Sequence, residues 1–433
     1  MELQKLSERL ALARTVKQLG IRNSDAVRYA YGLVVETVRR KNLIDKFVNS
    51  VLQPKEIGEF QMGVQAFLRL YIYQTRVVKG WGDVDLEEAE NIAKMGRAIL
   101  GWKTLRVVEP FLGFLLTRRL APVLEAAGDA ERVGLQTFHP TWFVEYCFNL
   151  LGRKEAVAFL EANVNTPPTY IRVNTLRGSE EAILERLDAE GVGLEKVELL
   201  RHVYKVTGAG RPLTCTRSFQ EGLFYIQDKA SVFAAEVADP KPGMRVLDVC
   251  AAPGAKTTYL AQLMQNQGLL CSVDYSIRRM QVWRREVSRM GVEIAEPVIA
   301  DACVSLPFAL EADVVVLDPP CTSTGVFAKQ PSAKWRLTSG SIEKMASIQQ
   351  QMISRCAETV KVGGVLTYST CSITVEENEL VVEGFLEGHP DFSLVEITPK
   401  LGVPGLRGLD RCQRLYPHIH GSNGFFIAKL LRK

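Results

Sequence analysis

The sequence lacks an apolar stretch long enough for a transmembrane helix, and it contains no C-x-x-C pair. Spanning a bilayer takes about 18 or more apolar residues without charge, and no run in the 433 residues reaches that length. The charged N-terminus does not resemble a secretory signal, so we expect a cytoplasmic protein without a membrane partner. Nine cysteines, an odd number, favour free thiols over disulfides or a zinc ribbon, and we expect no metal.

The composition is that of a globular chain with more than one domain. Hydrophobic residues make up 47% and charged residues 24%, and the length suggests about three domains. The net charge of +4 is concentrated at the start, because residues 1–130 carry 20 basic against 15 acidic side chains. Such a surplus suits contact with a phosphate backbone, although a solvated helical surface would show the same surplus.

Three regions differ in hydrophobic pattern. Residues 1–130 have helical periodicity throughout, and residues 137–235 mix short helices and strands in a small α+β domain. Residues 236–433 alternate short β-branched runs with turns and helical segments. That alternation predicts an α/β fold with a doubly wound parallel sheet, and the closing apolar run 424–431 would add an edge strand.

Four acidic residues stand at or near the ends of successive predicted strands, and a loop of small residues follows the first of these strands. In an open parallel sheet, ligands bind beyond the carboxyl ends of the strands, although a lone Asp there is more often a helix cap. The loop matches neither the dinucleotide nor the triphosphate glycine pattern, and Asp274 follows Gly254 at the distance typical of a ribose-binding acid. S-adenosylmethionine fits this pattern. The expected cofactor residues are Cys250, Ala251, Ala252, Pro253, Gly254, Ala255, Lys256, Asp274, Asp301 and Asp318, with Asp248 as the fourth strand-end acid.

Two cysteines, Cys321 and Cys371, follow two neighbouring predicted strands and should face the same pocket. A thiolate that adds to carbon 6 of cytosine makes carbon 5 nucleophilic, which is covalent catalysis. An acid such as Asp318 would donate or share a proton at ring nitrogen 3. The D-P-P-C sequence is also close to the loop of amino-group methyltransferases, but cysteine replaces the aromatic residue that those enzymes need. Cys250, Cys271 and Cys303 are better explained as core residues.

A cationic loop with an aromatic residue follows Cys321. Its residues suit the backbone of a nucleic acid and a stacked base, and they are Lys329, Lys334, Trp335 and Arg336. Five arginines on the predicted helix after Asp274 fit a solvated helix face better than an RNA site.

Taken together, the motifs of residues 137–433 resemble the Sun/Fmu (RsmB-like) family of RNA cytosine-5 methyltransferases. They include LDVCAAPGAKTT, DPPCTSTG, YSTCSI and NGFFIAKL, in that order. The resemblance implies a Rossmann-like methyltransferase domain, S-adenosylmethionine as cofactor, Cys371 as nucleophile and Cys321 as the residue that assists product release. One departure is Ala255, where the family usually has glycine, and alanine suffices if its φ is negative.

The N-terminal helical region is similar in length and character to the NusB-like domain of ribosomal RNA members of that family. This similarity favours small-subunit ribosomal RNA as substrate, with transfer RNA as an alternative. A non-catalytic RNA-binding assembly factor is the second alternative, against which the intact cysteine pair speaks. A monomer is favoured.

Overall fold

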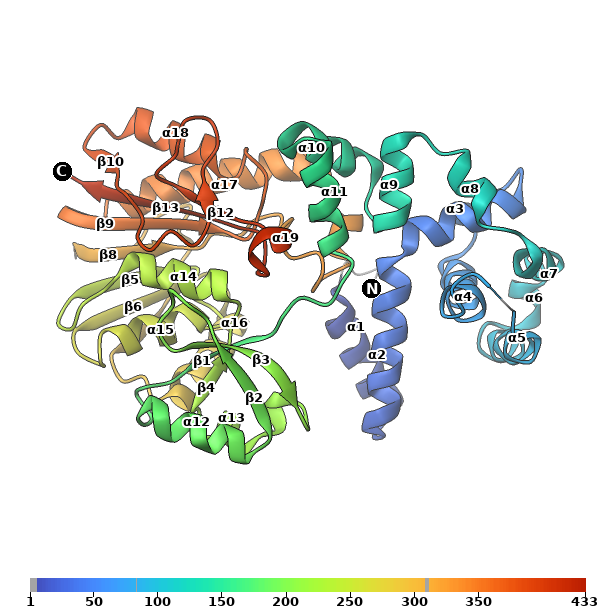
Figure 1. Ribbon diagram of the computed structural model, residues 1–433, viewed down its shortest axis with the longest axis horizontal. Coiled ribbons are helices and arrows are strands. Elements are labelled where there is room, and N and C mark those ends of the chain that lie inside the picture. The colour runs from blue at the N-terminus through green and yellow to red at the C-terminus, as the bar shows by residue number, and fades with distance from the viewer. Residues whose placement is uncertain (1–5, 83, 308–310) are drawn as a thin grey trace. The chain divides into compact units, whose positions relative to one another are not determined.

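The computed structural model describes residues 6–82, 84–307 and 311–433. The chain divides into two compact units (Figure 1), of which the first comprises Met1–Asn165 with Phe327–Arg336 and the second Thr166–Val326 with Leu337–Lys433. This division differs from the predicted boundary between residues 130 and 137. Two further helices belong to the helical unit, and so does a short segment from the catalytic region.

The first unit is helical, as its periodicity predicts. The side chain of Asn23 caps one helix by accepting the N–H groups of Asp25 and Ala26, at 2.9 and 3.0 Å. Buried apolar residues of α3 and α4, among them Phe47 and Leu68, form its core. The elements are α1 (Glu8–Leu19), α2 (Ser24–Arg39), α3 (Lys41–Leu52), η1 (Ile57–Glu59), α4 (Met62–Ile72), η2 (Tyr73–Val77), α5 (Leu86–Leu100), α6 (Trp102–Leu105), α7 (Glu109–Thr117), α8 (Ala121–Glu125), α9 (Asp129–Thr137), α10 (Thr141–Leu151), α11 (Arg153–Ala162) and η4 (Ala333–Trp335).

None of the helices in the described part of the chain is both long and apolar enough to span a bilayer.

The second unit begins with the small α+β region that the sequence predicts. Its four strands form an antiparallel sheet in the order β2-β3-β1-β4. The elements are β1 (Tyr170–Val173), α12 (Glu180–Ala189), β2 (Val192–Lys196), β3 (Val203–Ala209), η3 (Leu213–Cys215), α13 (Arg217–Gln220) and β4 (Phe224–Ile226).

The rest of this unit is the predicted doubly wound domain. Its sheet has the order β11-β12-β13-β9-β8-β5-β6-β7, with β10 beside β13, and the strands from β9 to β7 run parallel. The elements are α14 (Lys229–Ala238), β5 (Arg245–Val249), α15 (Ala255–Leu263), β6 (Leu269–Asp274), α16 (Ile277–Met290), β7 (Ala295–Ile299), β8 (Ala312–Leu317), α17 (Ser339–Ala357), β9 (Val360–Thr370), α18 (Glu379–Gly388), β10 (Phe392–Leu394), β11 (Val403–Pro404), β12 (Gln413–Leu415), α19 (Pro417–His420) and β13 (Phe425–Arg432).

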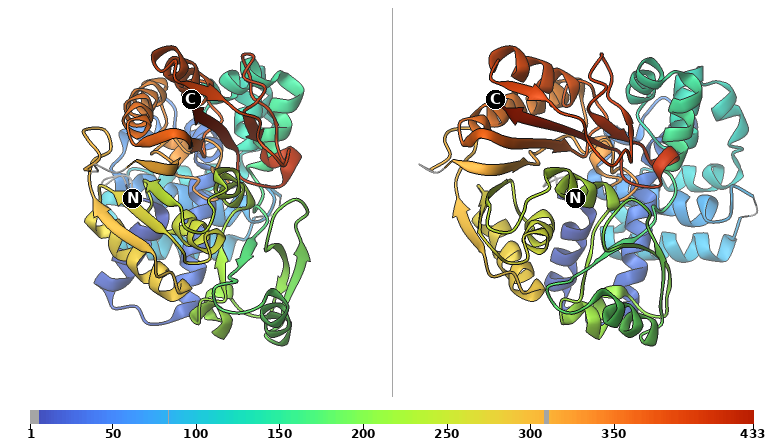
Figure 2. Two further views of the ribbon diagram at one scale, coloured as in Figure 1. Left: turned by 90° about the vertical axis from the view of Figure 1, so that its left-hand side faces the viewer. Right: turned by 60° about the vertical axis from the view of Figure 1, so that its left-hand side comes forward.

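Helices cover both faces of this sheet. Side chains alternate between the faces along a strand, so Val314 and Val316 of β8 join the core on the α14 and α15 side, whereas Val315 and Leu317 join the core under α17. Figures 1 and 2 show α17 and α18 on one face and α14, α15 and α16 on the other. Burial on both faces explains why the central strand β8 reads as a continuous apolar run, whereas the outer strand β7 is partly exposed.

The last strand is not the edge strand that the sequence predicted. β13 lies inside the sheet, antiparallel to β9 on one side and to β12 on the other. The short strands β11 and β12, which give no clear pattern in the sequence, continue the sheet beyond β13, and β11 is at its edge. The register of the central strands aligns Val249 with Leu317, and Leu317 with Tyr368. The loops after β5, β8 and β9 therefore leave the sheet at one common edge.

Candidate active site

The loop between β5 and α15 brings the backbone close to neighbouring groups. Gly254 has a φ of 109°, a conformation that favours glycine, and a Cβ there would make a tight contact of 3.3 Å with Cδ1 of Trp283. Ala255 is the first residue of α15 and has the negative φ of a helix, so the substitution of the family's glycine is accommodated. α15 begins directly after this loop, and its first amides have no acceptor within the helix.

Asp248 has a different role from the other strand-end acids. It lies within β5 and is 1% exposed, and its carboxylate accepts the hydroxyl hydrogen of Thr257 at 2.5 Å. The indole N–H of Trp283 donates to the same hydroxyl at 2.9 Å. Burial raises the pKa of Asp248 to about 7. This residue anchors α15 to the sheet, because its position one residue before the strand end turns it toward that helix.

Asp274 and Asp318 lie at the expected edge. Asp274 is 2% exposed, accepts the N–H of Ser276 at 3.0 Å and pairs with Arg279 at 3.0 Å. Arg279 also donates to the carbonyl of Ala252, which ties the cofactor loop to the end of β6. Asp318 forms an ion pair with the buried Lys256 of that loop.

Asp301 follows β7 and is exposed. Its carboxylate accepts the N–H of Cys303 at 2.9 Å, the kind of turn contact that a strand-end Asp often makes.

The two predicted cysteines meet. The Sγ atoms of Cys321 and Cys371 lie 3.2 Å apart, and the hydroxyl of Ser323 lies 3.5 Å from Cys371 and 3.9 Å from Cys321. The S–H of Cys321 lowers the pKa of the Cys371 thiol, with support from Ser323 and the Lys256 cation and against the effect of burial. The same contact, together with burial, raises the pKa of Cys321. The pair thus favours a thiolate at Cys371 and a thiol at Cys321.

Most of the remaining cysteines behave as core residues, whereas Cys215 is exposed. All nine are free, and Cys250, Cys271 and Cys303 pack against the core under α17, as predicted. Among the residues that the structure describes, no group of three or more His, Cys, Asp or Glu side chains is placed to hold a metal ion.

The predicted RNA loop needs a correction. Lys334 is 1% exposed, and the indole of Trp335 donates to the carbonyl of Val38 at 2.6 Å within the helical unit. Burial, with Arg39 and Arg40 nearby, lowers the pKa of Lys334 well below its usual value. These two side chains anchor the segment instead of facing a solvated ligand, whereas Lys329 and Arg336 are exposed.

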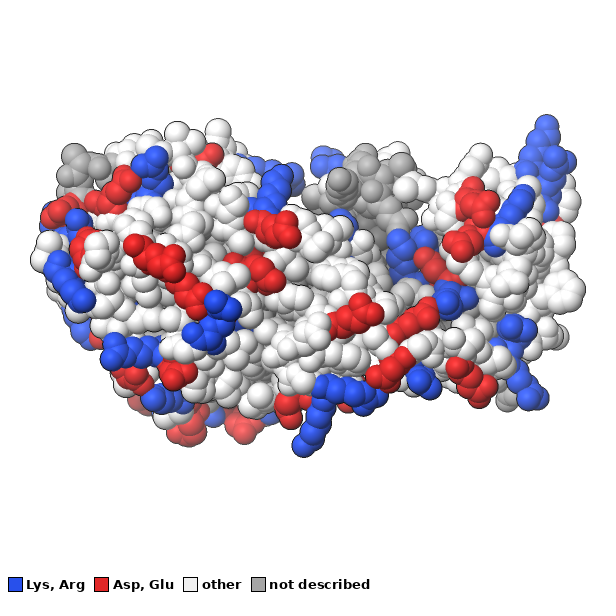
Figure 3. Space-filling view, turned by 90° about the horizontal axis from the view of Figure 1, so that it is seen from above, with Lys and Arg blue, Asp and Glu red and all other residues white. Residues whose placement is uncertain are grey.

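Some residues of the site gave no signal in the sequence. Arg279 was one of five arginines on a helix, and only the folded chain distinguishes it. Glu377 lies beside both cysteine loops, and nothing in its spacing from Cys371 indicated a role. Lys and Arg are interspersed with Asp and Glu on the face drawn in Figure 3, so surface charge there does not mark the site.

Comparison with known proteins identifies the family. Residues 235–431 match the family model described as 16S rRNA methyltransferase RsmB/F, and residues 139–210 match the ferredoxin-like domain of RsmF/B-like methyltransferases. A probable ribosomal RNA small subunit methyltransferase B of Bacillus subtilis is 30% identical over 93% of this chain and 89% of its own length.

Two further proteins extend the comparison. A tRNA (cytosine(72)-C(5))-methyltransferase of Pyrococcus horikoshii is 37% identical over 49% of this chain and 54% of its own length. The crystal structure of a protein named PH0851 matches with a TM-score of 0.80 and 30% identity, over 97% of this chain and 93% of that one. The chain therefore belongs to the RsmB/F family of S-adenosylmethionine-dependent RNA cytosine-5 methyltransferases.

Proposed function

We propose that this enzyme forms 5-methylcytidine in small-subunit ribosomal RNA through a covalent adduct between Cys371 and the target cytosine. The observation that carries the proposal is the contact between Cys321 and Cys371 at the carboxyl edge of the sheet, 3.2 Å between sulfurs. An S–H group beside a thiol stabilises its thiolate, and the thiolate is the nucleophile. The choice of ribosomal RNA follows the Bacillus subtilis relative, which aligns over 93% of the chain.

The residues of the first loop fit S-adenosylmethionine. Gly254 has no Cβ, so the backbone at this turn lies close to Trp283. Asp274 retains acceptor capacity for ribose hydroxyls in addition to its ion pair with Arg279. Asp301 is a further acceptor past the neighbouring strand, and Lys256 lies between this loop and Asp318. The cofactor supplies an electrophilic methyl group when bound.

The steps assigned to the chain conserve atoms and charge. The Cys371 thiolate forms a bond to carbon 6 of cytosine, and a proton held by Asp318 and its partner Lys256 is shared with ring nitrogen 3. Carbon 5 is then nucleophilic toward the methyl group that the bound cofactor would supply. Loss of the carbon 5 proton, assisted by Cys321, would break the bond between sulfur and carbon 6, so that the Cys371 thiolate is released and the proton on ring nitrogen 3 returns to the pair of Asp318 and Lys256.

A trapping experiment tests this mechanism. The Cys321→Ala variant, incubated with a 16S rRNA transcript and S-adenosylmethionine, should accumulate a protein–RNA adduct that survives denaturant. Removing Cys371 as well should abolish the adduct. Methylation that survives in Cys371→Ala, with no adduct in Cys321→Ala, contradicts the proposal.

Transfer RNA is the second candidate substrate, because the Pyrococcus horikoshii relative is named for it and shares 37% identity. Bisulfite mapping of both RNA classes from cells with and without the gene distinguishes the two. Loss of a methylated cytidine only in transfer RNA would favour this candidate over ribosomal RNA.

A further inference from the structure

Glu377 is a buried carboxylate beside both cysteine loops, and it has no assigned role. It lies just before α18 and is fully buried. Among the ion pairs of the described residues, none includes Glu377. Burying a carboxyl group is costly unless hydrogen bonds compensate for its lost hydration. The hydrogen-bond partners of Glu377 therefore indicate what this residue does.

The carboxylate binds the residue that follows each cysteine. It accepts the N–H of Thr322, next to Cys321, at 2.8 Å, and also accepts the Thr322 hydroxyl hydrogen. On the other side it accepts the hydroxyl hydrogen of Ser372, next to Cys371, at 2.6 Å. One carboxylate therefore connects the two loops directly.

Two more donors complete this arrangement. Thr374 donates its hydroxyl hydrogen to Glu377 at 2.8 Å, and Gln349 of α17 donates its amide at 3.0 Å. Gln349 also donates to the carbonyl of Pro320, the residue before Cys321, at 2.9 Å. Both oxygens of the Glu377 side chain thus accept hydrogen bonds, from a backbone N–H, an amide and three hydroxyls.

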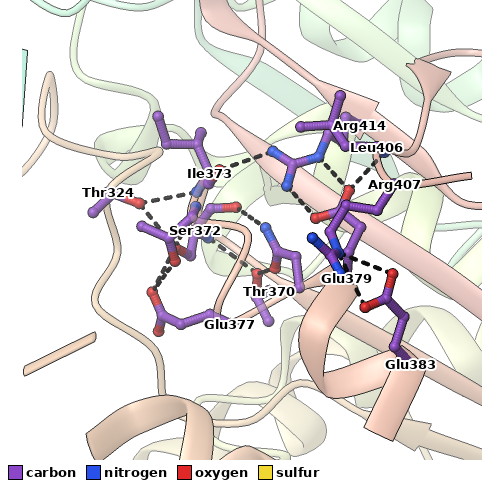
Figure 4. A network of polar contacts seen from close by, with 12 residues as sticks. Thr324, Thr370, Ser372, Ile373, Glu377, Glu379, Glu383, Leu406, Arg407 and Arg414 are labelled. Carbon is purple, nitrogen blue, oxygen red and sulfur yellow. Dashed lines mark hydrogen bonds and ion pairs between the residues drawn. The ribbon is translucent and has the colours of Figure 1, made fainter. Parts of the chain in front are cut away.

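The two residues after Glu377 hold the same loop from the other side. Asn378 accepts the hydroxyl hydrogen of Thr370 at 2.6 Å and donates to the carbonyl of Ser372 at 3.0 Å, so it binds both neighbours of Cys371. Glu379 forms a fully buried ion pair with Arg414, which donates to the carbonyl of Ile373 at 2.8 Å. Figure 4 shows these contacts together with the exposed pair of Glu383 and Arg407.

We propose that Glu377 is a positioning residue that sets the separation of the Cys321 and Cys371 sulfurs by binding the residue after each. This rests on the proposed role of Cys371 as nucleophile. The two loops are also joined by other bonds, because Gly325 donates its N–H to the carbonyl of Cys371 at 2.9 Å and Thr324 binds the Ser372 hydroxyl and the Ile373 N–H at 2.8 and 2.9 Å. Glu377 differs from these contacts in accepting hydrogen bonds from the residue after each cysteine at once. Its loss should therefore loosen the spacing of the two sulfurs without separating the loops.

The substitution Glu377→Gln tests this with little change in volume. An amide nitrogen cannot accept the N–H of Thr322 or the amide of Gln349, and opposite the hydroxyls it can bind only if these reverse from donor to acceptor, so the bonds to one of the loops should weaken. We expect kcat for methylation of a 16S rRNA transcript to fall about 10- to 100-fold, as for a misplaced catalytic group. The KM values should change much less. The matched control is Glu383→Gln, which removes only a partly exposed ion pair on α18 and should leave kcat unchanged.

The pH dependence of iodoacetamide alkylation, resolved for each cysteine by peptide mapping, separates positioning from charge. Loss of the Cys321 S–H contact should shift alkylation of Cys371 in Glu377→Gln to higher pH. Removal of a nearby negative charge alone would shift it to lower pH. An unchanged or lowered profile, with a folded protein and normal kcat, overturns the proposal.

A second variant keeps the test valid if Glu377→Gln does not fold. Thr322→Val removes one hydroxyl contact and leaves the Thr322 N–H in place, so it should change both readouts in the same direction by a smaller amount. No change in either readout would overturn the proposal. The adduct in Cys321→Ala is measured with Glu377 intact. Its absence refutes the proposed function, and its presence with normal Glu377→Gln kinetics refutes only the positioning role.

Discussion

At the scale of single residues, two aspartates of neighbouring strands show how one position along a strand decides a role. Asp248 lies one residue before the end of β5 and binds Thr257 beneath α15. Asp318 lies one residue past the end of β8 and pairs with Lys256 at the open edge. The sequence predicted both as strand-end acids, because it locates a strand well but its last residue only within a few positions.

The burial of Asp248 has a consequence for stability. Burial raises its pKa to about 7, whereas in the unfolded chain an Asp titrates near about 3.9. Between these values the folded protein binds a proton that the unfolded chain has lost, so stability falls as pH rises. The stability that Asp248 contributes is fully present below its pKa in the unfolded chain, and it is lost as the pH rises through its pKa in the folded protein.

We therefore predict that Asp248→Asn, which can still accept from Thr257, gains stability relative to wild type as pH rises. The gain should approach about 1 kcal/mol per pH unit between roughly pH 4 and 7, and then level off. Urea unfolding without cofactor measures it. Asp313 is the control of opposite sign. Although burial opposes it, hydrogen bonds from Lys361 and the Arg245 N–H lower the pKa of Asp313, so Asp313→Asn should lose stability above the unfolded pKa. A pH-independent difference for Asp248→Asn contradicts the prediction.

At the scale of elements, β5 is flanked by two glycines with positive φ that serve different purposes. Gly243 before the strand has a φ of 87° and open space around it, whereas Gly254 after the strand has a φ of 109° and faces Trp283.

The sequence predicted the loop after β5 and the cysteines past β8 and β9, because apolar runs that end in small or polar turns are local signals. The bonds of Glu377 join three separate elements, and no local pattern encodes them.

We predict that Gly254→Ala and Gly243→Ala both lower the free energy of unfolding by about 1–2 kcal/mol, the cost of a left-handed conformation for alanine. Only Gly254→Ala should also weaken the binding of S-adenosylmethionine, by about tenfold, because the added Cβ displaces the cofactor loop from Trp283. Calorimetric titration measures the affinity and thermal unfolding the stability. Equal losses of affinity in the two variants would show that the loop does not contact the cofactor.

At the scale of the whole molecule, the chain leaves the catalytic unit directly after the Cys321 loop and contributes Phe327–Arg336 to the helical unit. The N–H of Ser332 donates there to the carboxylate of Glu8, and Trp335 donates to Val38. A segment that combines lysine, tryptophan and arginine is typical of an RNA-binding loop. It is equally typical of a segment whose amphipathic side chains are buried in the protein. Only partners some 300 positions away in the sequence distinguish the two, so the sequence could not.

Substitutions of the two lysines in this segment, Lys334 and Lys329, distinguish anchoring from RNA binding. Lys334 is buried near Arg39 and Arg40, and its lowered pKa means that folding disfavours its charged form, which costs stability at neutral pH. Lys334→Met should therefore raise the unfolding midpoint, since an apolar side chain of similar length often replaces a buried charge without loss. Affinity for a 16S rRNA transcript should stay unchanged.

Lys329 is exposed in the same segment, so Lys329→Met should leave the unfolding midpoint unchanged. If its cation contacts a phosphate, the variant should bind the transcript more weakly. The slope of the logarithm of the binding constant against the logarithm of salt concentration should also decrease in magnitude by about one. Filter binding over a salt series measures both quantities for the two variants. A Lys334→Met protein that is less stable and binds RNA more weakly would return this lysine to the RNA interface, because an anchor that never meets solvent has no phosphate contact to lose.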